Sequence, residues 1–449
     1  MPPAALAKGG GRLPFASYGW QARRTHPTRL TDMANIAVLG ALDTKGAEVA
    51  FLTDQIAERG HKPIVIDVGV MGQPAFTPAI TRSAVATAAG HDVDRLAAEA
   101  DRGRAVTAMA DGAREVVAQL FAAGRIDAVI AMGGGAGTTI GTAAMRALPL
   151  GIPKVMVSTL ASGDVRGFVG VKDIVMVPAI VDISGLNRIS RGVFARAAAA
   201  VCGMVDARVP EGQDAPLVTA TMFGNTTKCV EAARALVEAA GFEVLVFHAV
   251  GTGGQTMESL IEAGHVAGVL DVTTTEWADE LVGGVMSAGP TRLEAAARTG
   301  TPAVIAPGCL DIVNFWEPHT LPERYQGRRI YQHNPKQTLI RTDPAENAEL
   351  GRIIAGKLNL SIGPVAVYFP LQGISVVSAP GGPYHWPEAD AALLESLQKH
   401  LRKDIPLHVM DMHINDPRFA GAMAEGLLGM MTNRPVRPQG SARSTAPLV

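Results

Sequence analysis

Residues 126–139 read IDAVIAMGGGAGTT, an apolar strand pattern that runs directly into a cluster of glycines. Helix-compatible residues follow as far as Leu148. A strand that ends in glycines and enters a helix places backbone N–H groups at the helix N-terminus with no Cβ in the way, so an anion can approach closely. The segment therefore predicts a phosphate-binding loop. Because neither GxxxxGK[ST] nor GxGxxG spacing is present, a tight turn that only packs the helix on the sheet stays an alternative.

A second apolar strand pattern, KVMV at residues 154–157, ends in the polar sequence STLASGD. Three hydroxyl groups and one carboxylate thus follow a strand that we expect to lie beside the first. Two neighbouring parallel strands with polar ends form a crevice at the carboxyl edge of a sheet, which is the usual place for a ligand.

Composition limits the classes of protein to consider. The chain has 449 residues, 47% of them hydrophobic and 18% charged, with a formal net charge of -2. Such a length favours two domains, and the near-neutral charge argues against a nucleic-acid partner or an anionic membrane surface. No apolar run reaches the roughly 18 residues that span a bilayer. Three cysteines without CxxC spacing indicate a reducing compartment, so we expect a cytoplasmic protein.

Domain boundaries follow from shifts in composition. Residues 1–32 are rich in arginine, proline and glycine, and we interpret them as a disordered extension or a misassigned start. A Pro/Gly-rich linker separates an N-terminal α/β domain at residues 33–208 from a C-terminal one at residues 216–432. The Pro-, Ser- and Arg-rich residues 433–449 are predicted to be a disordered tail.

The second domain repeats the pattern of the first. Thr44-Lys45-x-x-Glu48, at the start of the first helix, recurs as Thr227-Lys228-x-x-Glu231 between similar strands. The fold class expected is α/β, with two Rossmann-like domains that have mostly parallel sheets and arise from a duplicated half. Asp43 and Thr44 occupy positions where helix caps occur, so capping and a ligand role both stay open for residues 43–45.

Candidate ligand residues also follow strands in the second half. We expect a second small-molecule site there, formed by Gly251, Thr252, Gly253, Gly254, Thr273, Thr274, Thr275 and Cys309. The threonines before Glu276 are equally compatible with a capping box. Residues 311–342 are expected to form a long polar connection. Candidates for acid/base catalysis are Glu276, Asp311, His319 and His413. No HxxxH, HxH or HExxH spacing occurs, so no metal site is expected in the protein itself.

Taken together, these motifs identify a family resemblance. ALDTKG at residues 41–46, MGGG with Gly137-Thr138, GIPKVMVSTLASG at residues 151–163 and GTGG at residues 251–254 resemble the Tm-1-like ATP-binding family. These are the uncharacterised UPF0261 proteins, which are related to the tomato virus-resistance protein Tm-1. The resemblance covers about residues 35–431 and includes further matches at residues 273–285 and 287–290.

The resemblance implies two α/β domains, a homodimer, and ATP with Mg²⁺ as the cofactor of the N-terminal domain. Carried over residue by residue, the nucleotide contacts it implies are Asp43, Thr44, Lys45, Gly133, Gly134, Gly135, Gly137, Thr138, Thr139, Ser158 and Thr159. The antiviral activity is not carried over, because nothing in the sequence concerns viral targets.

The first hypothesis is therefore a nucleotide-binding protein with a second-domain site for an unknown small molecule. A metabolic enzyme, such as a lyase or hydrolase of a small oxygenated acid acting in the second domain, is the alternative. A non-catalytic binding module is the third hypothesis, and the sequence leaves open whether the protein is an enzyme.

Overall fold

The computed structural model describes residues 33–208 and 215–432. The chain divides into two compact units, the first ending at residue 212 and the second beginning at residue 213. The extension predicted at residues 1–32 and the tail predicted at residues 433–449 lie outside the described residues.

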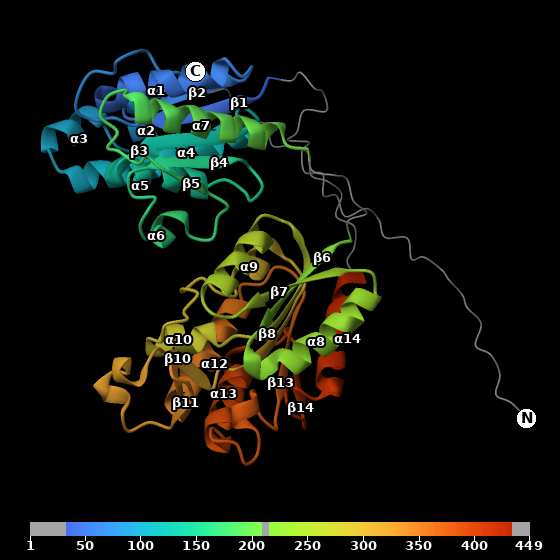
Figure 1. Cartoon of the computed structure of the whole chain (residues 1–449). Helices are drawn as coiled ribbons and strands as arrows, with labels where there is room; N and C mark the ends of the chain where they lie inside the picture. The colour runs from blue at the N-terminus through green and yellow to red at the C-terminus, as the bar shows by residue number, and fades with distance from the viewer. Residues whose placement is uncertain (1–32, 209–214, 433–449) are drawn as a thin grey trace, which may run out of the picture. The chain divides into compact units, whose positions relative to one another are not determined.

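The first unit is a five-stranded parallel sheet with helices on both faces (Figure 1), and its strand order is β2-β1-β3-β4-β5. The strands are β1 (Asn35–Gly40), β2 (Lys62–Asp67), β3 (Ala128–Gly133), β4 (Lys154–Ser158) and β5 (Val175–Pro178). The helices are α1 (Leu42–Ala57), α2 (Arg82–Ala88), α3 (Val93–Glu99), α4 (Arg102–Ala122), α5 (Gly135–Arg146), α6 (Arg166–Val169) and α7 (Arg188–Asp206).

The residues of β1 are apolar at successive positions, without the alternation of polar and apolar residues seen in a strand with one exposed face. Ile36 and Val38 belong to the core between the sheet and helices α1 and α7. Ala37 and Leu39 belong to the core on the opposite face, under α4 and α5. Successive side chains of a strand point to opposite faces, so a strand covered by helices on both sides must be apolar throughout.

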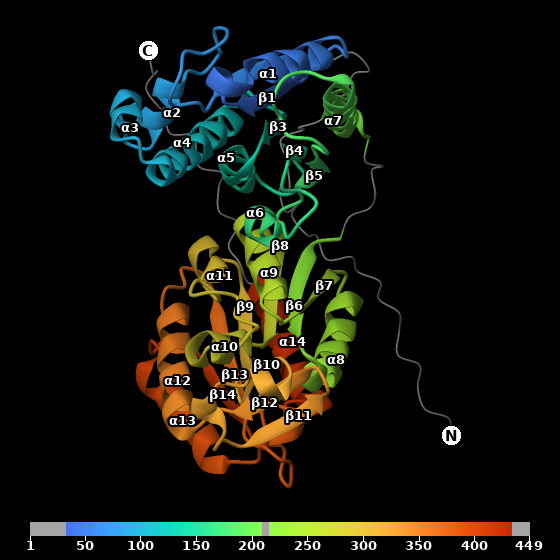
Figure 2. The same ribbon diagram turned by 60° about the vertical axis from the view of Figure 1, so that its left-hand side comes forward.

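The second unit has a six-stranded parallel sheet in the order β14-β13-β9-β8-β6-β7, and Figure 2 shows α8 and α14 on one face of it and α12 and α13 on the other. Its strands are β6 (Leu217–Met222), β7 (Glu243–His248), β8 (Val266–Thr273), β9 (Ala303–Gly308), β13 (Val365–Pro370) and β14 (Leu407–Met410). Its helices are α8 (Thr227–Ala239), α9 (Thr252–Glu262), α10 (Glu276–Val282), α11 (Ala295–Thr299), α12 (Pro344–Leu358), α13 (Pro387–His400) and α14 (Pro417–Thr432).

The two sheets share one topology, as a duplicated half predicts. The order β7-β6-β8-β9-β13 repeats β2-β1-β3-β4-β5, and β14 is added at the edge. The register agrees at the carboxyl ends, where Gly133 pairs with Ser158 in the first sheet and Thr273 pairs with Gly308 in the second. The predicted α/β class with two mostly parallel, Rossmann-like sheets is confirmed.

Residues 311–342 differ from the expected polar connection. They contain a separate antiparallel sheet in the order β10 (Ile312–Phe315), β12 (Gln337–Arg341), β11 (Ile330–Asn334). Phe315 and Ile340 from this sheet are buried in the core of the second unit. The strands were missed because runs of only four or five residues are too short to give a clear periodic signal.

Helices that could cross a membrane were sought in the two described ranges, and none there is both long and apolar enough.

Candidate functional site

The carboxyl edge of the first sheet is the candidate site. The chain leaves β1 to one side of the sheet, toward β2, and β3 lies on the other side of β1. In open α/β sheets, ligands bind at such a reversal of strand order, outside the carboxyl ends of the strands. The first turn of α1, which follows β1, lies at this edge and carries Asp43 to Lys45. The junction of β3 with α5 lies there too and carries the glycine cluster.

The glycines after β3 have two different roles. At Gly133 an added Cβ would lie 2.6 Å from the Cα of Gly137, so glycine is needed here for close packing of α5 on the strand. At Gly134 an added Cβ would lie 3.6 Å from the Thr159 hydroxyl, and at Gly135 it would meet no atom within 4 Å. A side chain thus has open space at Gly135 and only an ordinary contact at Gly134, so the start of the helix is not closed by close packing.

That open space lies at an uncapped helix start. Gly134 is the N-cap of α5, a helix of 12 residues, and no side chain among the described residues caps it. The first N–H groups of a helix lack acceptors within it, and the helix dipole adds partial positive charge there. The loop can thus bind an anion through its backbone.

Two of the predicted hydroxyl contacts instead brace this loop. Thr138 Oγ1 donates to the Gly134 carbonyl oxygen at 2.8 Å and lies 2.7 Å from Ser158 Oγ. Because the Thr138 proton is used, Ser158 donates to Thr138, and Ser158 also accepts from the Leu160 N–H at 2.9 Å. Both side chains are fully buried. Thr139 donates to the Gly135 carbonyl oxygen, and Thr159 is exposed beside Gly134.

Asp43 is likewise engaged within the protein. Its Oδ2 accepts hydrogen bonds from three successive N–H groups, those of Val70, Met71 and Gly72, at 3.0–3.2 Å. Arg82 lies 3.6 Å from the same oxygen. The carboxylate thus fixes the loop after β2 against the start of α1 through one of its two oxygens.

Arg82 and Asp67 complete this anchor, and sequence reasoning missed both. Arg82 Nε donates to Asp67 Oδ2 at 2.7 Å, while Asp67 Oδ1 accepts from the Leu42 N–H at 3.0 Å. Asp67 is the last residue of β2, so a buried carboxylate at a strand end was the signal available in the sequence.

Lys45 is free to act on a ligand. It has non-helical dihedral angles, φ −130° and ψ 21°, at a kink inside α1. Its ammonium group makes no hydrogen bond or ion pair with the described part of the chain, and the neighbouring Thr44 is exposed. A cation without a partner at the same sheet edge as an uncapped helix start complements a phosphate group.

In the second unit, the glycine segment that follows β7 already holds an anion. Glu276 Oε1 accepts hydrogen bonds from the Gly251 N–H at 2.8 Å and the Gly254 N–H at 3.1 Å. An added Cβ at Gly254 would collide with the carboxylate. The anion cradle predicted from residues 251–254 therefore forms, and a side chain of the protein fills it. Thr252 is exposed and Gly253 packs on the backbone of His248.

Glu276 belongs to a buried ionic cluster that sequence reasoning did not anticipate. Arg292 Nε donates to Glu276 Oε2 at 2.7 Å, and its two terminal nitrogens donate to both oxygens of Asp271 at 2.6 and 2.7 Å. Glu258 lies 3.2 Å from the same guanidinium. Burial raises the pKa of Glu276 and of Glu258, and Arg292 opposes the rise in both.

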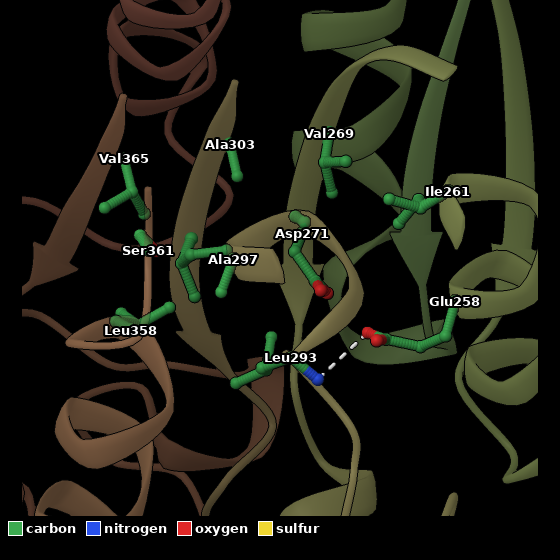
Figure 3. A pocket seen from close by; sticks show the side chains of 12 residues that line it. Glu258, Ile261, Val269, Asp271, Leu293, Ala297, Ala303, Leu358, Ser361 and Val365 are labelled. Carbon is green, nitrogen blue, oxygen red and sulfur yellow. Dashed lines mark hydrogen bonds between the residues drawn. The ribbon is translucent and has the colours of Figure 1, made fainter. Parts of the chain in front are cut away.

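A small cavity adjoins this cluster. Figure 3 shows the carboxylates of Asp271 and Glu258 at one side of it, with Glu258 accepting from the Leu293 N–H at 2.9 Å. Apolar side chains such as Val269 and Val365 line the rest. Its volume of about 10 Å³ is close to the smallest that can take one water molecule and is far too small for a metabolite.

The other residues of the predicted second site also have internal partners. Thr273 pairs with the Thr226 hydroxyl at 2.7 Å, Thr274 donates to the Ala306 carbonyl oxygen, and Thr275 donates to that of Ile312. All three threonines, and Cys309, are fully buried, and burial raises the pKa of the Cys309 thiol. The capping box considered for these threonines is not formed, since Thr275 makes no side-chain cap.

The structure brings together two of the four predicted catalytic residues. Asp311 Oδ2 accepts from the Ser375 hydroxyl at 2.6 Å, and His413 Nε2 lies 2.9 Å from the Ser375 carbonyl oxygen. Burial raises the pKa of Asp311 to about 6. Glu276 instead belongs to the Arg292 cluster, and His319 lies exposed in a 3-10 turn of residues 318–320. The second-site hypothesis stays a prediction.

Groups of three or more His, Cys, Asp or Glu side chains that could hold a metal were sought within residues 33–208 and 215–432, and none was found there.

Comparisons with known proteins cover both units. The N-terminal domain profile of the uncharacterised protein family UPF0261 matches residues 34–210, and its C-terminal domain profile matches residues 215–431. A UPF0261 protein of Clostridium tetani is 48% identical over 88% of this chain and 98% of its own length. One from Rhizobium meliloti is 45% identical over 87% of this chain and 97% of its length.

Plant relatives are longer proteins. The ToMV resistance protein Tm-1 of Solanum lycopersicum is 42% identical over 67% of this chain, which corresponds to 41% of the tomato protein. Among solved structures, a C2-type ketoreductase from a modular polyketide synthase covers 91% of this chain and 95% of its own, with 15% identity and a TM-score of 0.21. That score is too low to carry an argument.

Proposed function

The chain belongs to the uncharacterised protein family UPF0261, and from this membership and the geometry of the first unit we propose that it is an ATP-binding protein. The nucleotide binds at the carboxyl edge of the first sheet, with its phosphates in front of α5. The observation that carries the proposal is the uncapped start of α5, where an added Cβ at Gly135 would meet open space and one at Gly134 would only touch the Thr159 hydroxyl.

The predicted contacts divide into two groups in this proposal. Backbone N–H groups at residues 134–137 bind phosphate oxygens. The exposed Thr159 hydroxyl and the Lys45 ammonium, which has no partner in the part of the chain that the structure describes, complete the site. Thr138 and Ser158 hold the loop in shape, and Asp43 holds the neighbouring loop after β2. These three residues thus position the site without touching the nucleotide.

The protein offers few ligands of its own for Mg²⁺ at this edge. Asp43, the carboxylate nearest to Lys45 in the sequence, already accepts three N–H groups on one oxygen. Mg²⁺ keeps several waters and commonly binds through substrate phosphates. We therefore expect the ion to reach the site on the phosphates of ATP and to neutralise part of their charge.

Isothermal titration calorimetry of the intact protein tests the proposal. ATP with Mg²⁺ should bind with one site per chain, and inorganic triphosphate should bind to the same site more weakly, because the loop contacts only phosphates. Failure of both ligands to bind would refute the proposed function.

The alternative, a metabolic enzyme acting in the second unit, has one observation in its favour. Asp311 Oδ1 is buried and has no hydrogen-bond partner in the described residues, while its Oδ2 and His413 both contact Ser375. A buried carboxyl with a raised pKa, joined to the same serine residue as an imidazole, is a candidate for proton exchange with a substrate. Turnover of a small acid that is lost in Asp311→Asn and kept in Lys45→Met would favour this function.

A further inference from the structure

Ile180 has a backbone conformation that its side chain disfavours. Its φ is +66°, in the left-handed region where a β-branched residue is an outlier. The Val181 N–H donates to the Ala179 carbonyl oxygen at 2.8 Å, so Ile180 is the centre of a strained γ-turn. Its side chain is 73% exposed, so burial in the core of the first unit does not offset the strain.

Other exposed apolar side chains occur in the neighbouring loops. Leu160 follows β4, Leu186 lies in the same loop as Ile180, and Ile189 is in the first turn of α7. Leu160, Ile180 and Leu186 all follow carboxyl ends of parallel strands, and Ile189 begins the next helix. The exposed apolar surface of this part of the unit therefore lies at the same edge of the sheet as the phosphate loop.

Backbone hydrogen bonds fix this segment relative to the phosphate loop. The Thr159 N–H donates to the Gly133 carbonyl oxygen at 3.3 Å, and the Ala179 N–H donates to that of Ser158 at 3.0 Å. Ile180 therefore lies two strand positions away from the glycine loop, at roughly 10 Å across the sheet edge. This separation is comparable with the distance between the phosphates and the base of an extended nucleotide.

A buried carboxylate holds the same loop against the helix that carries Lys45. Glu48 Oε1 accepts the Gly185 N–H at 2.6 Å, and Glu48 is only 2% exposed. In Figure 1 the loop is the green segment between β5 and α7, and it approaches α1. The apolar side chains are thus placed by the two elements, β4 and α1, that also place the proposed phosphate contacts.

We propose that Ile180, with Leu160 and Leu186, forms the surface on which the base of the bound nucleotide lies. This inference rests on the proposed function. Flat aromatic bases are bound by apolar side chains at sites where a few polar groups fix the orientation. Contact with the base then explains why a strained isoleucine is exposed at the ligand edge, since strained residues cluster at binding sites.

The test compares two exposed isoleucines in the full-length protein. Ile180→Asn keeps a residue that tolerates positive φ and removes the apolar contact. Ile362→Asn, at a 66% exposed position of the second unit, is the matched control. Titration calorimetry should show ATP affinity reduced about tenfold by Ile180→Asn, the loss expected for an apolar contact of this size. Inorganic triphosphate affinity should stay unchanged, and Ile362→Asn should change neither.

Two outcomes would overturn the base-binding surface while leaving the proposed function intact. One is equal ATP affinity in wild type and Ile180→Asn. The other is a wild-type oligomer that light scattering shows dissociated by Ile180→Asn without any change in ATP affinity, since the isoleucine would then contact protein. A wild-type protein that binds neither ATP nor triphosphate overturns the proposed function, and this inference with it.

Discussion

The two units share one strand order, but the glycine segments at the carboxyl edges of their sheets differ in what lies against them. In the first, the glycine loop after β3 leads to an uncapped helix, and Lys45 at the same edge has no partner among the described residues. In the second, the carboxylate of Glu276 fills the cradle formed by residues 251–254, and Arg292 neutralises it from behind. A duplicated fold can thus leave a glycine segment without an internal anion in one unit and fill one with a side chain of the protein in the other.

The largest expected effect is a loss of stability in the second unit, when the cation beside Glu276 is removed. Arg292→Met leaves Glu276, Asp271 and Glu258 buried without their cation, so the free energy of unfolding should fall by about 3–5 kcal/mol. Urea unfolding followed by tryptophan fluorescence measures this, because Trp277 is buried and donates to the Arg292 carbonyl oxygen at 3.2 Å.

The control for that variant is Arg298→Met, which breaks ion pairs of a half-exposed arginine with Glu262 and Glu294. Such pairs contribute about 0–1 kcal/mol. Equal destabilisation by the two arginine variants would show that the buried cluster is not what stabilises the second unit.

A substitution in the glycine loop of the first unit should change ATP affinity and leave the stability of the fold unchanged. Gly134→Val fits the backbone, whose φ is −79°, but places methyl groups where we propose the phosphates. ATP affinity should fall about 100-fold or more, close to 3 kcal/mol, while the circular dichroism spectrum stays unchanged. Gly254→Ala, in the glycine segment that Glu276 fills, should instead lower stability, because its Cβ collides with Glu276. Unchanged ATP affinity in folded Gly134→Val would remove the phosphate site from the first unit.

The pH dependence of stability should separate the units further. Burial raises the pKa of Asp279 to about 7, and that of Asp311 to about 6. The folded state holds the protons of these two carboxyl groups more tightly than the unfolded state does. Their contribution to the free energy of unfolding is therefore complete below the ordinary carboxyl pKa and is lost as pH rises toward 7. The unfolding free energy of the second unit should fall by about 1.4 kcal/mol per pH unit for each such group.

Urea titrations at several pH values between 4 and 8, read by tryptophan fluorescence, measure that slope. Asp279→Asn should flatten it. A free energy of unfolding that rises with pH through this window would contradict the raised pKa values.

The smallest expected effect concerns the repeated lysines. Lys45→Met should weaken ATP binding about fivefold, close to 1 kcal/mol, because it removes one charge beside the phosphates. Lys228→Met should change ATP binding little, since Lys228 is exposed at the equivalent position of the second unit. Calorimetric titration of both variants decides this, and equal effects would return both lysines to the role of solvated side chains.

Several features could be predicted from the sequence because they depend on local patterns. The helices and strands around residues 126–158, the order of elements in each half and the duplication all follow from periodicity and from glycine positions. The residues that hold each loop could not be predicted. Arg82 pairs with Asp67 across 15 residues, and Arg292 pairs with Asp271 across 21. Ion pairs between residues so far apart in the sequence leave no periodic pattern from which they could be predicted.

The antiparallel sheet at residues 312–341 shows a different limit. Its strands are short, and polar side chains such as Asn314 and Thr338 interrupt their apolar residues. Their burial depends on partners from α10 and α12, which only the folded unit supplies.

By itself, the sequence determined that this protein has two parallel α/β halves and that glycines and hydroxyls follow their strands. Only the tertiary structure decided which of these groups have partners within the protein. Thr138, Ser158 and Asp43 have internal partners, whereas the Lys45 ammonium has none within residues 33–208 and 215–432. The physical reason is that a buried polar group must be hydrogen-bonded, and whether its partner is the protein or a ligand depends on residues that are distant in the chain and adjacent in the fold.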